Sequence, residues 1–174
     1  KPDIMVSGIN HGSNASISVI YSGTMGAAIE ACLNGIPSIG FSLLDHSADA
    51  NFEPSKPFVE RVFSQILINK LPEYICLNVN IPNVPLEQIR GIKVCRQTHG
   101  VWKEEFEKRI DPHGGEYYWL TGNFKNFEVG NPETDEWALE NNYVAVVPIH
   151  ADFTAYQSLN GLRYLQHEST KTSL

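Results

Sequence analysis

The segment SGINHGSN (7–14) gathers residue types that bind ligands through neutral polar groups. Asn10 and Asn14 each offer an amide oxygen and an amide nitrogen, and Gly12 allows a ligand to approach the backbone closely. His11 is the only titratable side chain in the segment, and a lone histidine of this kind more often makes a hydrogen bond than acts as a base. We expect a binding loop here, with plain turn formation by Asn and Gly as the simpler alternative.

A second polar segment, YSGT (21–24), stands where a helix is expected to begin. The first N–H groups of a helix have no partner within it, so they can hold an anion such as phosphate. Two hydroxyl groups add further hydrogen-bond donors to the same place. The residues expected to bind phosphate are therefore Ser22, Gly23 and Thr24, although Ser22 could also serve only as the helix cap.

Other polar residues stand at the ends of expected strands, but none completes a familiar catalytic motif. Asp45 and His46 follow one apolar strand, and His150 and Asp152 follow another. A solvated turn is the simpler role for the first pair, and helix capping for Asp152. The sequence contains no Walker P-loop, no dinucleotide-binding fingerprint, no HExxH and no GxSxG.

Apolar periodicity predicts alternating strands and helices around these segments. The expected strands cover 4–7, 38–44, 74–81, 92–95 and 143–149, with a loop at 8–18. The expected helices cover 22–35, 57–70, 134–140 and an amphipathic C-terminal stretch at 153–166. This order, with strands that are continuously apolar, predicts an α/β fold whose mostly parallel sheet is covered on both faces.

Residues 97–130 depart from that pattern, because they are charged and aromatic rather than apolar. DPHGG (111–115) is a turn signal between two possible strands, so we expect a projecting β-hairpin arm. An arm with this many large aromatic side chains is expected to bury them against another subunit. These side chains are Trp102, Phe106, Tyr117, Tyr118 and Trp119.

Composition sets the outer limits of the interpretation. The 174 residues, 42% of them hydrophobic, fit a single domain over 1–174. No apolar run reaches the ~20 residues of a membrane span, so we expect no membrane association. The net charge of −7 argues against a specific nucleic-acid partner. Three cysteines without a CxxC pair are expected to be buried thiols, which fits the cytoplasm.

Several motifs together resemble the survival protein E (SurE) family of nucleotidases. They include PDIMVSGINHGSN at 2–14 and IYSGTMGAAIEA at 20–31. The likeness continues through GIPSIGFSL, LNVNIP, RGIKVCRQ, DPHGGEYYW and TDEWALENNYVAVVPIHADFTA. It spans nearly the whole chain, and the pairing of SGIN-x-G-x-N with YSGT is highly specific.

The resemblance implies a metal-dependent phosphomonoesterase acting on nucleoside 5′- and 3′-monophosphates, and in some members on short polyphosphate. The implied fold is a Rossmann-like three-layer α/β/α domain. Its hairpin arm (97–130) and C-terminal helix (153–166) exchange between subunits of a homodimer or homotetramer. Two adjacent aspartates, one serine and one asparagine hold the Mg²⁺ or Mn²⁺ ion.

The family pattern also assigns roles to residues of this chain. Asn10 matches the metal-binding asparagine and is expected to be catalytic together with Asn14, which would orient the phosphate. The phosphate pocket is expected to be lined by Gly12, Ser22, Gly23 and Thr24.

The sequence departs from the family pattern at its start. No Asp-Asp pair occurs in these 174 residues, so two aspartate ligands and the serine ligand lack counterparts. The chain begins Lys-Pro-Asp without Met, which favours a domain truncated at its N-terminus. One amide oxygen cannot hold a hard divalent ion, so we expect this chain to be inactive by itself. The alternative function is that of a non-catalytic assembly module held together by the arm and the C-terminal helix.

Overall fold

The computed structural model describes residues 2–166 and contains a central five-stranded sheet. Its strands in spatial order are β1 (Met5–His11), β2 (Ser38–Leu43), β3 (Ile75–Ile81), β7 (Tyr143–His150) and β4 (Gly91–Val94). The pairs β1–β2, β2–β3 and β4–β7 are parallel, and β7 runs antiparallel to β3. The prediction of an α/β fold with a mostly parallel sheet is therefore confirmed.

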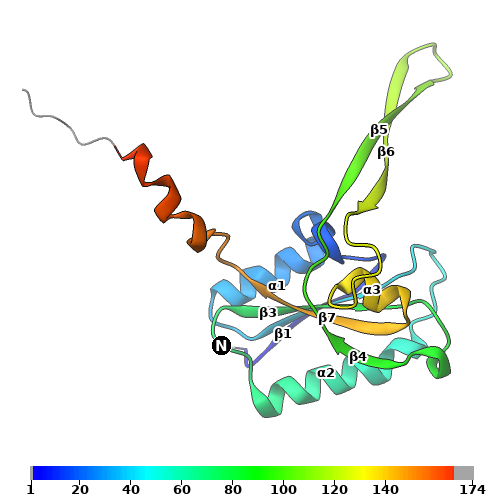
Figure 1. Ribbon diagram of the computed structural model, residues 1–174. Coiled ribbons are helices and arrows are strands. Elements are labelled where there is room, and N and C mark those ends of the chain that lie inside the picture. The colour runs from blue at the N-terminus through cyan, green and yellow to red at the C-terminus, as the bar shows by residue number, and fades with distance from the viewer. Residues whose placement is uncertain (1, 167–174) are drawn as a thin grey trace, which may run out of the picture.

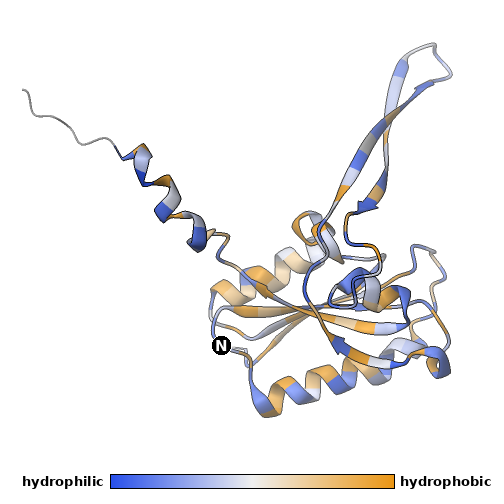
Figure 2. Ribbon diagram, in the orientation of Figure 1, coloured by the Kyte–Doolittle hydropathy of each residue, from blue (hydrophilic) through white to orange (hydrophobic). Residues whose placement is uncertain are grey.

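Helices cover both faces of this sheet (Figure 1). α1 (Gly23–Leu33) and α3 (Asp135–Glu140) lie on one face, and α2 (Lys56–Asn69) lies on the other. Side chains alternate along each strand accordingly. Leu77, Val79 and Ile81 of β3 pack in the cluster that contains Val62 of α2, whereas Cys76 packs in the α1 cluster. Figure 2 shows the apolar residues concentrated in the strands and on the inner faces of the helices.

α1 begins and ends where the sequence predicts. The Ser22 side chain accepts a hydrogen bond from the backbone N–H of Met25 at 3.1 Å, which caps the first turn. Met25, Ala28 and Cys32 form the buried face at helical spacing. Gly35 follows the helix with a φ of +65°, a conformation that favours glycine.

The first strand is longer than expected. β1 continues through Asn10 to His11, which pairs with Leu43 of β2, so the predicted loop at 8–18 is wrong over its first four residues. The pairing shifts register between Ser7 and Asn10. This irregularity interrupts the alternation of side chains and hides the strand from a pattern analysis. A 3₁₀ helix, Ser16–Tyr21, begins within the rest of the expected loop and continues past its end.

The hairpin arm is present and projects from the body (Figure 1). It consists of β5 (Gly100–Ile110) and β6 (Glu116–Asn126), paired antiparallel over their whole length. Asp111 closes the turn by accepting hydrogen bonds from the backbone N–H groups of His113 and Gly115, each at 2.8 Å. The arm aromatics predicted to need cover are 41–69% exposed.

The C-terminal segment also leads away from the body (Figure 1). The single helix expected at 153–166 is wrong: two 3₁₀ helices, Tyr156–Ser158 and Asn160–Leu165, take its place. An amphipathic segment gains most of its helical stability from packing, and this one has its apolar side chains exposed. Among the described residues, no helix is long and apolar enough to cross a bilayer.

Candidate functional site

The carboxyl ends of β1, β2 and β3 meet at one edge of the sheet because these strands are parallel. Asn10 and the Asp45 segment both lie at this edge. His150 pairs with Ile75 at the start of β3, so it lies at the opposite edge, away from Asn10. The helix-capping role expected for Asp152 is wrong, because Ala155 is the N-cap of the 3₁₀ helix Tyr156–Ser158 that follows. The Asp152 carboxylate instead accepts a hydrogen bond from the backbone N–H of Thr154 at 2.8 Å, which forms a turn.

Asn10 presents one free oxygen. Its Nδ2 donates hydrogen bonds to the carbonyl oxygens of His11 and Gly12, each at 3.0 Å. These two bonds fix the plane of the side-chain amide. No described residue donates a hydrogen bond to Asn10 Oδ1, which leaves this oxygen available to a cation or a donor.

Asn14 lies in a buried network of amides that sequence reasoning missed. Its Nδ2 donates to Ser42 Oγ at 2.6 Å, and its backbone N–H donates to Asn80 Oδ1 at 2.8 Å. Asn78 Nδ2 donates to the Asn14 carbonyl at 2.8 Å, and Asn80 Nδ2 donates to Asn78 Oδ1 at 2.9 Å. The two asparagines of β3 thus hold the binding loop against the sheet. Asparagine at alternate positions of an apolar strand, as in LNVNI (77–81), was the available signal.

The start of α1 offers backbone donors. The N–H of Gly26 donates to the Ser22 carbonyl at 2.8 Å as the first intrahelical bond, so Gly23 and Thr24 precede the bonded part of the helix. Gly23 is exposed, and a Cβ placed on it would meet no atom within 4 Å. The N–H groups of Gly23 and Thr24 have no acceptor among the described residues, and they lie at the positive end of the helix dipole.

Gly12 and His11 have packing partners in the loop after β2. Gly12 has a φ of +91°, and a Cβ there would lie 2.0 Å from Cε1 of His46, so only glycine fits. The His11 Nδ1 lies 2.9 Å from the Ser47 carbonyl oxygen, and the His11 ring packs edge-on against Phe52 at 5.0 Å. These contacts join the β1 and β2 loops into one unit.

Asp45 is tied into a turn of its own. Its carboxylate accepts hydrogen bonds from the Ser47 backbone N–H at 2.9 Å, from the Ser47 hydroxyl at 2.5 Å and from Asn83 Nδ2 at 3.0 Å. The bonds from Ser47 lower the pKa of Asp45 below its ordinary value. The carboxylate stays ionised, and the simpler role of a turn residue fits it.

Asp135 positions two segments of the site, a role that the sequence did not reveal. Thr134 caps α3, and the fully buried Asp135 carboxylate links two distant segments. It accepts from the Ser16 N–H at 2.8 Å, from the Thr98 N–H at 2.9 Å and from the Thr98 hydroxyl at 2.6 Å. The N–H of Glu136 adds a fourth bond at 2.9 Å. The binding loop is thereby joined to the base of the arm.

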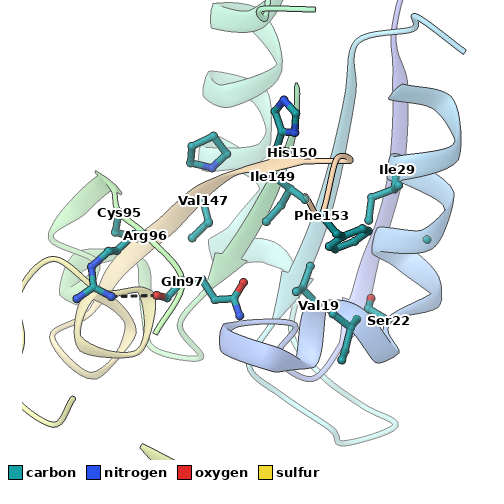
Figure 3. Close-up of a pocket in the computed structure, with 13 residues that line it drawn as sticks. Val19, Ser22, Ile29, Cys95, Arg96, Gln97, Val147, Ile149, His150 and Phe153 are labelled. Carbon is teal, nitrogen blue, oxygen red and sulfur yellow. Dashed lines mark hydrogen bonds between the residues drawn. The ribbon is translucent and has the colours of Figure 1, made fainter. Parts of the chain in front are cut away.

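A cavity of about 460 Å³ opens between the binding loop, the start of α1 and the arm. It contains Asn14 and Ser22 from the predicted set, and its remaining lining residues are Ser13, Ser18, Tyr21, Trp102, Leu120, Thr121 and Gly122. A second cavity, of about 480 Å³, lies between α1 and β7 (Figure 3). Its walls are mainly apolar, with Arg96 and Gln97 on one side and Phe153 across from them. The first cavity is the candidate site, because it holds both loop and helix-start residues.

The described residues do not form a complete metal site. Within 2–166, no group of three or more His, Cys, Asp or Glu side chains is placed to hold an ion. Asn10 contributes a single amide oxygen, whereas Mg²⁺ and its relatives need several oxygen ligands with at least one carboxylate. The backbone N–H groups at the start of α1 can bind an anion, whereas the described side chains fall short of a divalent-cation site.

The chain is similar to known proteins over most of its length. The family model described as "Survival protein SurE" matches residues 1–104. A protein of Christiangramia forsetii named "5'-nucleotidase SurE" is 57% identical over 93% of this chain and 62% of its own length. A Flavobacterium psychrophilum protein of the same name is 52% identical over 93% of this chain and 63% of its own length. This chain therefore spans slightly under two thirds of these relatives.

A solved structure shows the same fold. The crystal structure of the SurE protein from Aquifex aeolicus aligns with a TM-score of 0.80 at 40% identity, covering 96% of this chain and 66% of that one.

Proposed function

This chain belongs to the SurE family, and on that premise we propose that its protein hydrolyses the phosphate ester of nucleoside monophosphates. Relatives over 50% identical carry the name 5'-nucleotidase SurE. The observation that carries the proposal is the pair of N–H groups at the start of α1, beside a cavity large enough for a small organic ligand. We propose 5′- and 3′-monophosphates as substrates, with short polyphosphate as a further one.

Each residue at the site has a part in holding the phosphate. The N–H groups of Gly23 and Thr24 would bind two phosphate oxygens, with the Thr24 hydroxyl as a third donor. Donors fixed in this way stabilise the charge that develops on the phosphoryl oxygens during hydrolysis. Ser22 caps the helix and so fixes their direction. The Asn14 network keeps the facing loop in place.

We propose Mg²⁺ or Mn²⁺ as the cofactor of the whole protein, with Asn10 Oδ1 as one ligand. The remaining ligands are not among the described residues, so we derive no catalytic step through the ion. We propose that the 174-residue chain by itself releases no phosphate from a nucleoside monophosphate. A phosphate-release assay on protein of verified mass tests this, and metal-stimulated turnover would overturn it.

A substitution at the first position of α1 tests the phosphate site directly. Gly23→Pro removes one N–H, yet proline suits this position of a helix, the space is open, and Ser22 is already extended. Gly23→Ala keeps the N–H and serves as the matched control. Calorimetric titration with AMP should show about tenfold weaker binding for Gly23→Pro and little change for Gly23→Ala. Equal affinities for the two variants would contradict the site.

The assembly module remains the second candidate, and the exposed aromatics of the arm favour it. We propose that the arm and the C-terminal segment join copies of this chain into a dimer or tetramer. Sizing chromatography combined with the phosphate-release assay separates the two functions. An oligomer that binds no nucleotide would support assembly alone.

We propose a reducing compartment, the cytoplasm, for this protein. Cys32, Cys76 and Cys95 are buried and unpaired. Burial raises the pKa of Cys76 to about 12 and that of Cys95 to about 11, so both stay protonated thiols.

A further inference from the structure

We infer that the 460 Å³ cavity binds the nucleoside of the substrate, with the base stacked on Trp102. The inference rests on the proposed function, because it places the other half of a molecule whose phosphate lies at the start of α1. Ser22 belongs both to the helix start and to the cavity wall, so the two subsites are adjacent. A nucleotide could therefore span them without a rearrangement of the protein.

The two walls of the cavity differ in chemistry in the way a nucleoside requires. The loop wall carries the polar side chains of Ser13, Asn14 and Ser18. The arm wall carries Trp102 and Leu120, with Gly122 leaving room beside them. A ribose presents hydroxyl groups, which suit the polar loop wall. A base presents two flat faces, which suit the aromatic and apolar arm wall.

Trp102 is held as a rigid surface. Its indole Nε1 donates to Ser18 Oγ at 3.1 Å, and its ring packs against Phe124 with the centroids 5.8 Å apart. The side chain is still 41% exposed. An aromatic ring with its polar edge fixed and part of its surface open is a suitable partner for stacking.

Asn14 supplies a directed polar group. The residue is only 6% exposed, and its amide nitrogen donates a hydrogen bond to Ser42 Oγ. No described residue donates to Asn14 Oδ1, although Asn14 lines the cavity. Among the described residues, the side-chain atom that is enclosed without a partner is Ser55 Oγ, so Asn14 Oδ1 is an accessible acceptor that a ligand donor can reach. Ribose hydroxyls and exocyclic base amines are donors of this kind.

Contacts outside the cavity fix the position of the loop wall relative to the arm wall. Asp135 holds Ser16 on the loop side and Thr98 at the arm base through one carboxylate. Arg96 and Glu128 pair beside it, with Nη1 of Arg96 3.0 Å from Oε2 of Glu128. The arm base therefore keeps a fixed position relative to the loop, and the cavity is present before a ligand binds.

Tryptophan substitutions on the arm test the inference in the full chain. Trp102→Leu removes the stacking surface, and Trp119→Leu is the matched control, because Trp119 is 53% exposed and lies outside the cavity. AMP, adenosine and ribose 5-phosphate are titrated by calorimetry. Loss of one stacked base costs roughly 1–3 kcal/mol, or about 5- to 150-fold in affinity. Trp102→Leu should weaken the binding of AMP and adenosine by that factor and leave the affinity for ribose 5-phosphate unchanged. Trp119→Leu should change none of the three affinities.

The outcomes separate this inference from the proposed function. If ribose 5-phosphate binds but adenosine does not, the nucleoside site is wrong and the phosphate site stands. If adenosine binds through Trp102 and the phosphate adds no affinity, the nucleoside site stands and the phosphate site fails. Equal loss of AMP affinity in both tryptophan variants, or no saturable binding of AMP or adenosine to the parent chain, would overturn the inference.

Discussion

In the network that joins the β1–α1 loop to β3, polar groups are buried and most have hydrogen-bond partners, whereas in the arm large apolar side chains stay exposed. Asn14, Asn78 and Asn80 are each at most 6% exposed and bonded to one another. Phe106 and Tyr118 on the arm are 69% and 56% exposed. The contrast fits the proposal that the arm packs against a partner surface, whereas the loop network finds its partners among the described residues. Each prediction below tests one side of this contrast.

The largest expected effect on stability is at Asp135, whose carboxylate joins the loop to the base of the arm. Asp135→Ala leaves the Ser16 and Thr98 N–H groups buried without acceptors, so the free energy of unfolding should fall by about 3–5 kcal/mol. Urea denaturation followed by circular dichroism measures it. Glu133→Ala, an exposed acidic neighbour, is the control and should cost under about 0.5 kcal/mol. A loss below about 1 kcal/mol in Asp135→Ala would mean that the joint is not structural.

A smaller effect is expected inside the loop network. Asn80→Ala removes the acceptor of the Asn14 N–H and a donor to Asn78, which should cost about 1–3 kcal/mol of unfolding free energy. Asn83→Ala, just beyond the end of the same strand and exposed, provides the comparison in the same denaturation experiment. Equal costs at the two positions would remove the distinction between a buried network and an ordinary surface amide.

The free energy of unfolding should depend on pH through Glu136, the neighbour of Asp135. Burial, with repulsion from Asp135 and Glu140, raises its pKa from 4.5 to about 7. The folded state favours the protonated carboxyl, so this residue lowers stability as the pH rises from about 4.5 through 7. Partial exposure reduces the effect to about 1–2 kcal/mol. Glu136→Gln should therefore be more stable than the parent at pH 8 and equal to it at pH 4. A constant difference across this range would contradict the assigned pKa.

The smallest effect on stability is expected on the arm. The double change Phe106→Ser and Tyr118→Ser removes exposed apolar surface, so the free energy of unfolding should move by less than about 0.5 kcal/mol. Self-association, measured by sedimentation velocity over a range of concentrations, should weaken strongly. An unchanged association constant would show that the arm does not join the copies.

The sequence predicts well those elements that depend on local patterns. α1 was predictable because a capping serine, apolar residues at helical spacing and a following glycine are all encoded within 22–35. The arm was predictable from its turn signal. The extension of β1 was not, because its pairing with β2 continues past a register shift that breaks the alternation.

The site was predictable in part, for a similar reason. Asn10, Asn14 and Ser22 are recognisable from types and spacing within a short segment. The residues that hold them come from distant positions: Asp135 bonds the Ser16 N–H across 119 residues, and Asn80 bonds the Asn14 N–H across 66. Only the folded chain brings such pairs together. The prediction of a C-terminal helix was wrong for a different reason. The apolar pattern of that segment is present, but its side chains have no surface to pack against among the described residues.

The central claim is that the start of α1 and the adjoining cavity bind a nucleoside monophosphate. A titration of AMP into the ¹⁵N-labelled chain, followed by NMR, tests it most directly. The account predicts that the largest chemical-shift changes occur at the backbone amides of Gly23 and Thr24 and at the indole N–H of Trp102. Largest changes at Ile149 and Phe153, which line the other cavity (Figure 3), or no saturable change at any residue, would contradict it.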